Sequence, residues 1–262
     1  MNLDLRGKNA LIGGGSQGLG LASAIELSKL GASCTLVSRK EETLENALLN
    51  LDVSKGQTHN YLVADYSKPS EILEKVKAKL EKGYVWHILL LNSGGPASGN
   101  ILDLSVSDFQ QGFDMHFHTS HELSRLLIPG MKAAGYGRIV SVLSISIKQP
   151  IAELPVSNAI RSGLASWAKT LANEVGKFNI TVNNVLPGYT ETDRLEYLFE
   201  KRAELASTSV EKIKEVYKEQ VPMKRLGKPE EFGAAVAFLC SPAASYINGI
   251  NLPVDGGATK SL

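Results

Sequence analysis

The chain is built from short apolar segments, rich in valine, isoleucine and leucine, that alternate with longer segments of helical periodicity. Strands buried on both faces of a parallel sheet have this composition, because crossover helices cover both faces of such a sheet. Seven segments fit such strands, at residues 9–14, 33–38, 58–64, 86–92, 137–143, 179–186 and 250–255. The alternation predicts an α/β fold with a doubly wound, seven-stranded parallel sheet and helices on both faces.

The clearest helical periodicity follows Pro155, where apolar residues recur every three or four positions along one stripe. The stripe consists of Ile160, Leu164, Ala168, Leu171 and Val175. Residues 193–222 are also helix-prone, but they are highly charged and interrupt the alternation with strands. We expect a single domain over residues 1–262, because no linker divides the chain, and a helical lid beside the substrate site at residues 193–222.

The charges are balanced, with 28 lysines and arginines against 27 aspartates and glutamates, so nucleic acid and anionic membranes are not expected partners. A small-molecule substrate is expected instead. The sequence begins without a charged segment that leads into a long apolar one, and no run approaches the roughly 18 apolar residues of a membrane span. We therefore expect a cytoplasmic protein. Cys34 and Cys240 lie in apolar runs and are expected to be buried core residues, and no metal site is predicted.

A glycine-rich turn follows the first predicted strand and precedes a helical run. Residues 13–20 of this turn are Gly-Gly-Gly-Ser-Gln-Gly-Leu-Gly. Glycines let the backbone turn tightly and let a pyrophosphate approach N–H groups at the N-terminus of a helix. The residues expected to contact a dinucleotide here are Gly14, Ser16, Gln17, Gly18, Leu19 and Gly20.

The spacing of these glycines resembles that of the short-chain dehydrogenase/reductase family, whose fold is of the Rossmann type, and the resemblance extends from Leu5 to about Gly257. It implies further cofactor contacts at Asp65 and the adjacent Tyr66, at Asn92, Ser93 and Gly94 after the fourth strand, and at Pro187, Gly188 and Thr190 after the sixth. Residues 221–257 are similar to the C-terminal segment of the 3-oxoacyl-[acyl-carrier-protein] reductase branch. That segment builds a subunit interface in the branch, so the resemblance implies a homotetramer or homodimer.

The end of the second predicted strand indicates which dinucleotide is bound. An acidic residue there would accept a hydrogen bond from the 2′-hydroxyl of NAD and would repel a 2′-phosphate. This chain has Ser38 and Arg39 instead, which offer hydrogen-bond donors to a phosphate. NADP(H) is therefore the expected cofactor. Gln17 is uncharged where many NADP-dependent members have a second basic residue, and Arg39 facing solvent is the alternative interpretation.

The resemblance breaks down at the proton-transfer residues. Family members use a serine after the fifth strand, a tyrosine that donates the proton, a lysine four residues later and an asparagine in a preceding helix. Ser144 occupies the serine position, but Ser157 stands at the tyrosine position, Arg161 at the lysine position and His116 at the asparagine position. These four residues, with Arg161 also holding the ribose, are the candidate catalytic residues.

The replacements exclude the usual proton donor. A serine hydroxyl is a much weaker acid than a phenol, and an arginine keeps its proton, so Arg161 is suited to stabilising an oxyanion rather than to acid catalysis. Ser157 and Arg161 are four residues apart and can form a polar pair on one helix face. His116, His118 and Tyr189 are alternative proton donors in the sequence, whereas His59, His87 and His121 receive no role.

Two functions agree with this pattern. The first is an NADP(H)-dependent short-chain oxidoreductase, similar to the 3-oxoacyl reductases, that acts on a carbonyl or hydroxyl compound with an altered proton path. The second is a catalytically silent NADP(H)-binding sensor or assembly protein. The retained cofactor segments favour the first, and the joint loss of tyrosine, lysine and asparagine motivates the second.

Overall fold

The computed structural model describes residues 1–261 and contains one parallel sheet. Its strands are β1 (Asn9–Gly13), β2 (Ser33–Ser38), β3 (Asn60–Val63), β4 (Ile88–Leu91), β5 (Gly137–Val142), β6 (Ile180–Pro187) and β7 (Asn251–Val254). The sheet order is β3-β2-β1-β4-β5-β6-β7, and every neighbouring pair is parallel. The chain therefore winds outward in both directions from the β1–β4 pair, as the Rossmann-type prediction requires. The predicted fold class is confirmed.

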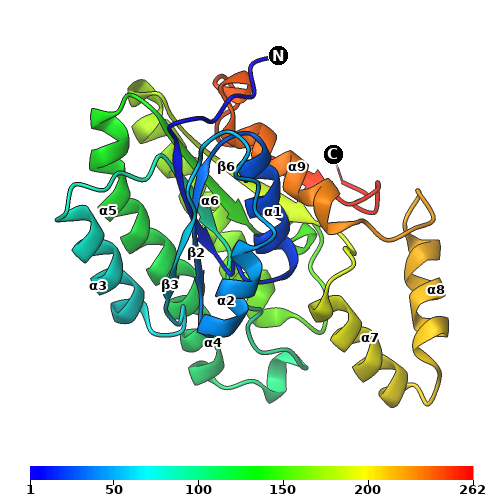
Figure 1. Cartoon of the computed structure of the whole chain (residues 1–262). Coiled ribbons are helices and arrows are strands. Elements are labelled where there is room, and N and C mark those ends of the chain that lie inside the picture. Colours follow the sequence, from blue (N-terminus) through cyan, green and yellow to red (C-terminus); the bar gives the residue numbers. More distant parts are fainter. Residues whose placement is uncertain (262) are drawn as a thin grey trace.

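Helices cover both faces of the sheet (Figure 1). One face buries apolar residues of α1 (Gly18–Lys29), α2 (Glu41–Leu48) and α9 (Pro229–Cys240). The other face buries those of α3 (Pro69–Leu80), α5 (Thr119–Ala133) and α6 (Pro155–Val175). Between β4 and α5 lie the short helix η1 (Ile101–Asp103), α4 (Val106–Gly112) and a π-helical segment, η2 (Phe113–His118). The described residues also include three short helices: η3 (Ile145–Ile147), η4 (Gly176–Phe178) and η5 (Pro242–Ala244).

Strands β3 and β4 each begin two residues later than the sequence predicts, and a histidine side chain accepts a backbone hydrogen bond just before each of them. The segments were predicted to start at residues 58 and 86, whereas β3 starts at Asn60 and β4 at Ile88. The ring of His59 accepts a hydrogen bond from the backbone N–H of Cys34 at 3.1 Å. The ring of His87 likewise accepts from the N–H of Asn9 at 3.1 Å. An imidazole thus takes the place of a backbone carbonyl at these two positions, which also gives both histidines a structural role.

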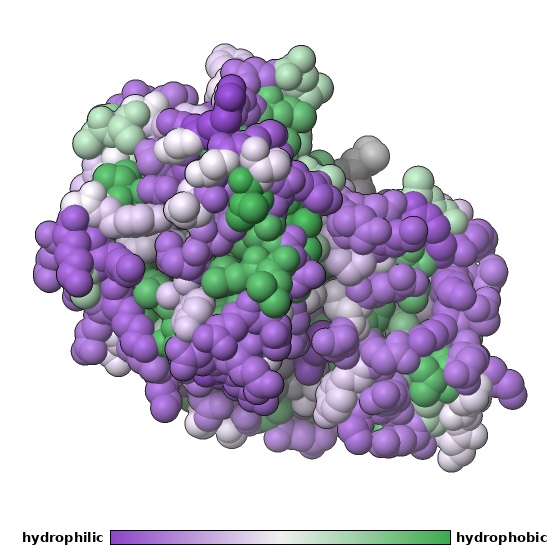
Figure 2. All heavy atoms as spheres, in the orientation of Figure 1, coloured by the Kyte–Doolittle hydropathy of each residue, from purple (hydrophilic) through white to green (hydrophobic). Residues whose placement is uncertain are grey.

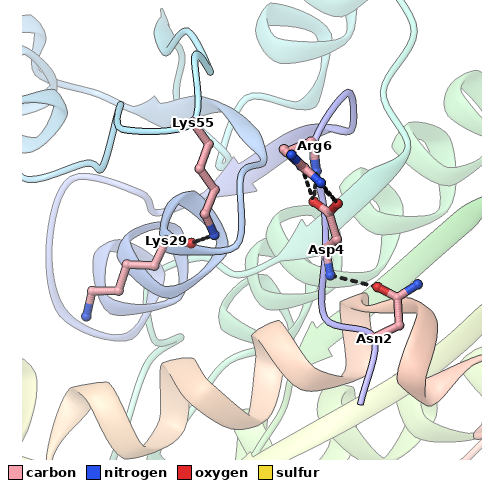
Figure 3. Close-up of polar contacts among 5 residues, drawn as sticks. All are labelled: Asn2, Asp4, Arg6, Lys29 and Lys55. Atoms are coloured by element: carbon pink, nitrogen blue, oxygen red, sulfur yellow. Dashed lines mark hydrogen bonds and ion pairs between the residues drawn. The ribbon is translucent and has the colours of Figure 1, made fainter.

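Local polar contacts involve the segment before β1 and, separately, the C-terminal end of α1 (Figure 3). Asp4 accepts hydrogen bonds from Arg6 at 2.6–3.0 Å, and its own N–H donates to the side chain of Asn2 at 3.1 Å. Lys55 donates to the backbone carbonyl of Lys29, the last residue of α1, at 2.5 Å. The hydrogen bonds from Arg6 lower the pKa of Asp4 to about 2. This end of the molecule is built from local polar contacts at the amino ends of the strands.

Helices α7 (Asp193–Leu205) and α8 (Val210–Gln220) form a pair, the α7–α8 pair, that stands beside the main body (Figure 1). Phe199, Tyr217 and Leu226 are buried together in a small apolar cluster of their own. Most of the visible surface over the pair is hydrophilic (Figure 2). Arg202 of α7 forms an ion pair with Glu153, in the loop before α6, at 3.0 Å. The pair is therefore a distinct packing unit that one charged contact ties to the loop before α6.

Within residues 1–261, none of the helices is long and apolar enough to cross a membrane. The same part of the chain contains no cluster of three or more histidine, cysteine, aspartate or glutamate side chains arranged to hold a metal ion. Cys34 and Cys240 are buried and unbonded, and burial raises the pKa of both thiols.

Candidate active site

The candidate site lies at the carboxyl ends of β1, β4, β5 and β6, where their connecting loops leave one edge of the sheet. The sheet order changes direction between β1 and β4, and ligands of doubly wound folds bind in the crevice outside such a position. The loops after these four strands contain the glycine turn, the Asn92 segment, Ser144 and the Pro187 turn. The topology therefore brings together segments that are far apart in the sequence.

The glycine turn after β1 contains backbone angles that residues other than glycine rarely adopt. Gly14 and Gly18 have φ angles of +57° and +54°, in the left-handed region that favours glycine. A Cβ at Gly20 would lie 2.1 Å from the carbonyl oxygen of Gly14, so the first turn of α1 packs directly on the turn before it. Gln17 occupies the N-cap position without donating or accepting a side-chain capping bond. The first N–H groups of α1 are thus free of side-chain caps, as an anion-binding helix N-terminus needs.

Side chains at the ends of β2 and β4 contact this turn. The hydroxyl of Ser16 donates to that of Ser38, at the end of β2, at 2.9 Å. The amide of Asn92 donates to the carbonyl of Gly13 at 3.1 Å. The hydroxyl of Tyr66 is buried without a hydrogen-bond partner and lies where a Cβ on Gly13 would be. Asn92 and Tyr66 therefore shape the turn, while Leu19 packs its side chain against the core below α1.

Arg39 is exposed directly after the end of β2. Its charge contributes to lowering the pKa of Asp65; partial burial raises this pKa, but hydrogen bonds with Ser67 and the charges of Arg39 and Lys68 outweigh the effect of burial. No described residue accepts a hydrogen bond from the Arg39 guanidinium. The structure thus brings Arg39, Ser38 and Asp65 to the same end of the sheet, with the guanidinium available to an external phosphate.

Arg161 is the most constrained side chain of the site. One terminal nitrogen, Nη1, donates to the carbonyls of Val142 and Leu143 at 2.6 and 3.0 Å, and Nε donates to the hydroxyl of Ser157 at 3.0 Å. Burial lowers the pKa of Arg161 to about 10, which keeps the guanidinium charged at neutral pH. Within the described chain no acceptor is bonded to the second terminal nitrogen, Nη2. Helix α6 thus holds a fixed positive charge at the end of β5, and the N–H groups of Nη2 remain available as donors.

His116 lies in the π-helical segment and is buried, with 5% of its surface exposed. Its Nδ1 lies 2.9 Å from the hydroxyl of Ser93, and its Nε2 is buried without a partner. Burial first, and the nearby charge of Arg161 second, lower the pKa of His116 to about 3. His116 is therefore a neutral imidazole at physiological pH. It carries no readily transferred proton of the kind that an imidazolium would offer.

Ser144 and the Pro187 turn complete the site. The side chain of Ser144 caps the short helix η3 by accepting from the N–H of Ser146 at 3.0 Å. After Pro187, the N–H of Gly188 donates to the carbonyl of Val254 at 3.0 Å. Thr190 is buried, and the hydroxyl of Thr192 caps α7 by accepting from the N–H of Leu195 at 3.3 Å. The turn thereby runs from the sheet edge directly into the α7–α8 pair.

The alternative proton donors, His118 and Tyr189, each contact a neighbouring side chain. His118 is exposed and lies 3.7 Å from Asp114 on its own helix. Tyr189 packs edge-on against Tyr217, with ring centroids 4.6 Å apart, and burial raises the pKa of its hydroxyl. His121 accepts a hydrogen bond from the indole of Trp167 at 3.2 Å. Tyr189 therefore contributes to the packing of the α7–α8 pair.

Two residues near the site were not singled out from the sequence. Arg194, on the first turn of α7, lies against Gly95: a Cβ on Gly95 would lie 3.1 Å from its Nη2. Glu153 joins two loops and α7, because its carbonyl accepts from the N–H of Gly99 at 3.0 Å and its carboxylate pairs with Arg202. Neither belongs to a sequence motif, and the charge-rich segment around Arg194 was the only signal that pointed to it.

The fold and this set of loops define an oxidoreductase-type dinucleotide-binding protein. A family model described as enoyl-(acyl carrier protein) reductase matches residues 14–259. The 3-oxoacyl-[acyl-carrier-protein] reductase FabG of Pseudomonas aeruginosa is 32% identical over 269 residues, which cover 99% of this chain and 100% of that protein. The chain belongs to the short-chain dehydrogenase/reductase family, a family of NAD(P)-dependent oxidoreductases.

Solved structures are similar over the whole chain. The L-sorbose reductase of Gluconobacter frateurii, in complex with NADPH and L-sorbose, superposes with a TM-score of 0.93 at 32% identity and full coverage of both chains. A 3-oxoacyl-(acyl-carrier-protein) reductase of Agrobacterium tumefaciens with NADP bound has a TM-score of 0.87 at 25% identity, covering 97% of this chain and 95% of that one. The predicted family membership is confirmed.

Proposed function

We propose that the protein is an NADP(H)-dependent oxidoreductase that interconverts a carbonyl compound and the corresponding alcohol, with Arg161 stabilising the oxyanion and no side chain in the role of the usual acid. The observation that carries the proposal is the anchored guanidinium beside Ser144 and Ser157, whose Nη2 has no bonded acceptor among the described residues. A fixed, partly desolvated cation at this position stabilises the oxyanion that develops as a hydride reaches a carbonyl carbon. NADPH, when bound, supplies that hydride.

The residues present fit this cofactor. The uncapped N-terminus of α1 and the glycine turn provide backbone N–H groups for the diphosphate. Ser38 and Arg39 provide donors for the 2′-phosphate, and no acid stands at positions 38–40, at the end of β2, to repel it. The relatives solved with NADPH or NADP bound support the same cofactor. We assign Asp65, Asn92, Gly94, Gly188 and Thr190 to the remaining contacts with the dinucleotide.

The proton path is the part of the mechanism that this chain has changed. The carbonyl oxygen takes a proton from water as the carbon gains the hydride, so the products are the alcohol, NADP⁺ and a hydroxide ion that takes up a proton from bulk solvent. Arg161 does not donate this proton, because it stays charged. Ser144 and Ser157 orient the oxygen, while neutral His116 positions Ser93 at the edge of the site. Losing the phenol in this way should make turnover slower than in members that retain it.

We also propose that the α7–α8 pair is the lid of the substrate site within a single domain. The pair follows directly from the Pro187 turn, and the Glu153–Arg202 ion pair links it to the loop before α6. A closed lid would exclude bulk water from the oxyanion.

The chain is proposed to assemble as a homotetramer or homodimer. Strand β7 lies at one end of the sheet order, so its outer edge pairs with no strand of the described chain. Such an edge is available to a second copy. Light scattering of the purified protein gives the oligomeric state directly.

The direct test is NADPH oxidation at pH 7 by the wild-type protein and by Arg161→Ala, over a panel of 3-oxoacyl thioesters, aldehydes, ketones and quinones. We expect wild-type turnover and a loss of at least about a hundredfold in Arg161→Ala, the effect of removing an oxyanion donor. Arg161→Lys should retain part of the activity. Cofactor binding without turnover on any substrate would favour the silent NADP(H)-binding protein.

A further inference from the structure

Two cations of the α7–α8 pair, Arg194 and Lys212, form no ion pair with the described residues, and Arg194 lies against the loop after β4. Lys201, Lys214 and Lys218 each pair with a glutamate of the pair itself, and Arg202 pairs with Glu153. Among the described residues, Arg194 has neither a carboxylate within ion-pair distance nor a hydrogen-bond acceptor. Its guanidinium is exposed and makes only a π contact with Tyr197, whose ring centroid is 5.8 Å away.

The position of Arg194 is set by the start of its helix. Thr192 caps α7, so the backbone of the first turn is fixed. Asp193 borders a groove against α1, whereas Arg194 lies on the loop after β4, with three guanidinium atoms 3.1–3.5 Å from where a Cβ on Gly95 would be. The lack of a side chain at Gly95 allows this approach. Arg194 therefore connects the start of the lid with the loop that contains Asn92 and Ser93.

We infer that Arg194 binds an anionic group, a phosphate or carboxylate, at the mouth of the active site. A guanidinium offers a planar fork of donors that matches both groups, and an unpaired one between two segments of a cofactor site is free to accept such a ligand. The inference rests on the proposed function, because the anion belongs either to the diphosphate of the cofactor or to an acidic substrate. In both cases the ligand would draw α7 toward the β4 loop.

The test uses the full chain as wild type, Arg194→Gln, Arg194→Lys and the control Lys212→Gln. Lys212 is the matched control because it is an exposed cation of α8 that forms no ion pair with the described residues. Affinities for NADPH and NADH are measured by fluorescence titration. The affinity of the NADP⁺-loaded protein for malonate, a dicarboxylate probe, is measured by calorimetry. We expect Arg194→Gln to lose about tenfold or more in one of these affinities, as for a hydrogen bond to a charged group.

Equal losses for NADPH and NADH would assign Arg194 to the cofactor diphosphate, and a loss for malonate alone would assign it to the substrate. Arg194→Lys should keep part of the affinity, and Lys212→Gln should match the wild type. Unchanged affinities in Arg194→Gln would overturn the inference. If the wild type binds neither dinucleotide, the proposed function fails instead, and titration with inorganic pyrophosphate still tests Arg194.

Discussion

The side chain of Arg39 shows how one residue can set cofactor choice. It is exposed after β2, beside Ser38, and its charge contributes to lowering the pKa of Asp65. A 2′-phosphate would compete for the guanidinium and would bring two charges of its own. In the proposed function, Arg39 would discriminate between the cofactors through a contact with the adenosine end of the dinucleotide, remote from the reacting atoms.

We predict that Arg39→Ala weakens NADPH binding by about tenfold or more and leaves NADH binding within about twofold, because only NADPH carries the phosphate. Titrations of both dinucleotides against the same preparation measure the two effects. Lys40→Ala, which removes the adjacent exposed charge, is the control. Equal losses for both dinucleotides would contradict the assignment of NADP(H) through Arg39.

His116 gives the protein an acid-sensitive component of stability. Its pKa is lowered in the folded state to about 3, so the unfolded chain, with a histidine pKa near 6.5, binds the proton more readily. The stabilisation is present above pH 6.5 and is lost as the pH falls toward 3. His87 is shifted in the same direction by burial.

We predict that His116→Asn reduces the loss of stability on going from pH 7 to pH 5 by about 2 kcal/mol, from the linkage between pKa and folding. Urea unfolding at the two pH values measures this change. His118→Asn is the matched control, because His118 is exposed on the same helical segment. An unchanged pH dependence in His116→Asn would show that this histidine is not the buried neutral group described above.

Among the elements, the strands could be predicted from the sequence, whereas the residues at which β3 and β4 begin could not. All seven strands and their parallel pairing follow from composition, since buried parallel strands are continuously apolar. The late starts of β3 and β4 coincide with rings that accept backbone hydrogen bonds across the sheet, and no local pattern reports such contacts.

The candidate site also has features that the sequence predicts and features that depend on tertiary contacts. The glycine turn and the replaced residues at 116, 157 and 161 are visible in the sequence because a family motif fixes their positions. The anchoring of Arg161 on two carbonyls and the neutral state of His116 depend on burial by distant segments. Arg194 and Glu153 act through tertiary contacts alone, and hence no motif contains them.

The Glu153–Arg202 ion pair is the element-scale feature that is easiest to test. A partly exposed ion pair contributes at most about 1 kcal/mol, so Glu153→Gln should lower Tm by less than about 4 °C. It should still increase cleavage by proteinase K between α7 and α8, where Ser207 is exposed. Glu204→Gln, which breaks the Lys201–Glu204 pair within α7, is the control. Equal cleavage in both variants would argue against a tie between the lid and the body.

At the scale of the whole molecule, the proposed cofactor segments come from loops that follow β1, β2, β3, β4 and β6. A ligand that touches all of them joins parts of the sheet that are separated in sequence. Binding to the folded state alone adds RT ln(1 + [L]/Kd), about 2.7 kcal/mol at a hundredfold excess over Kd. We predict a corresponding rise in Tm with NADPH and a smaller one with the same concentration of NADH, measured by calorimetry. No rise with either would contradict dinucleotide binding.

The contacts around the glycine turn restrict substitution there more than at the proton-transfer positions. A methyl group at Gly13, Gly14 or Gly20 would collide with Asn92, Tyr66 or the backbone of the turn itself, so a substitution there must rebuild two loops at once. Ser157, Arg161 and His116 instead project from helices whose backbone bonds do not depend on their identity. A lineage can therefore change its proton-transfer residues by single substitutions while the glycine turn after β1 stays the same.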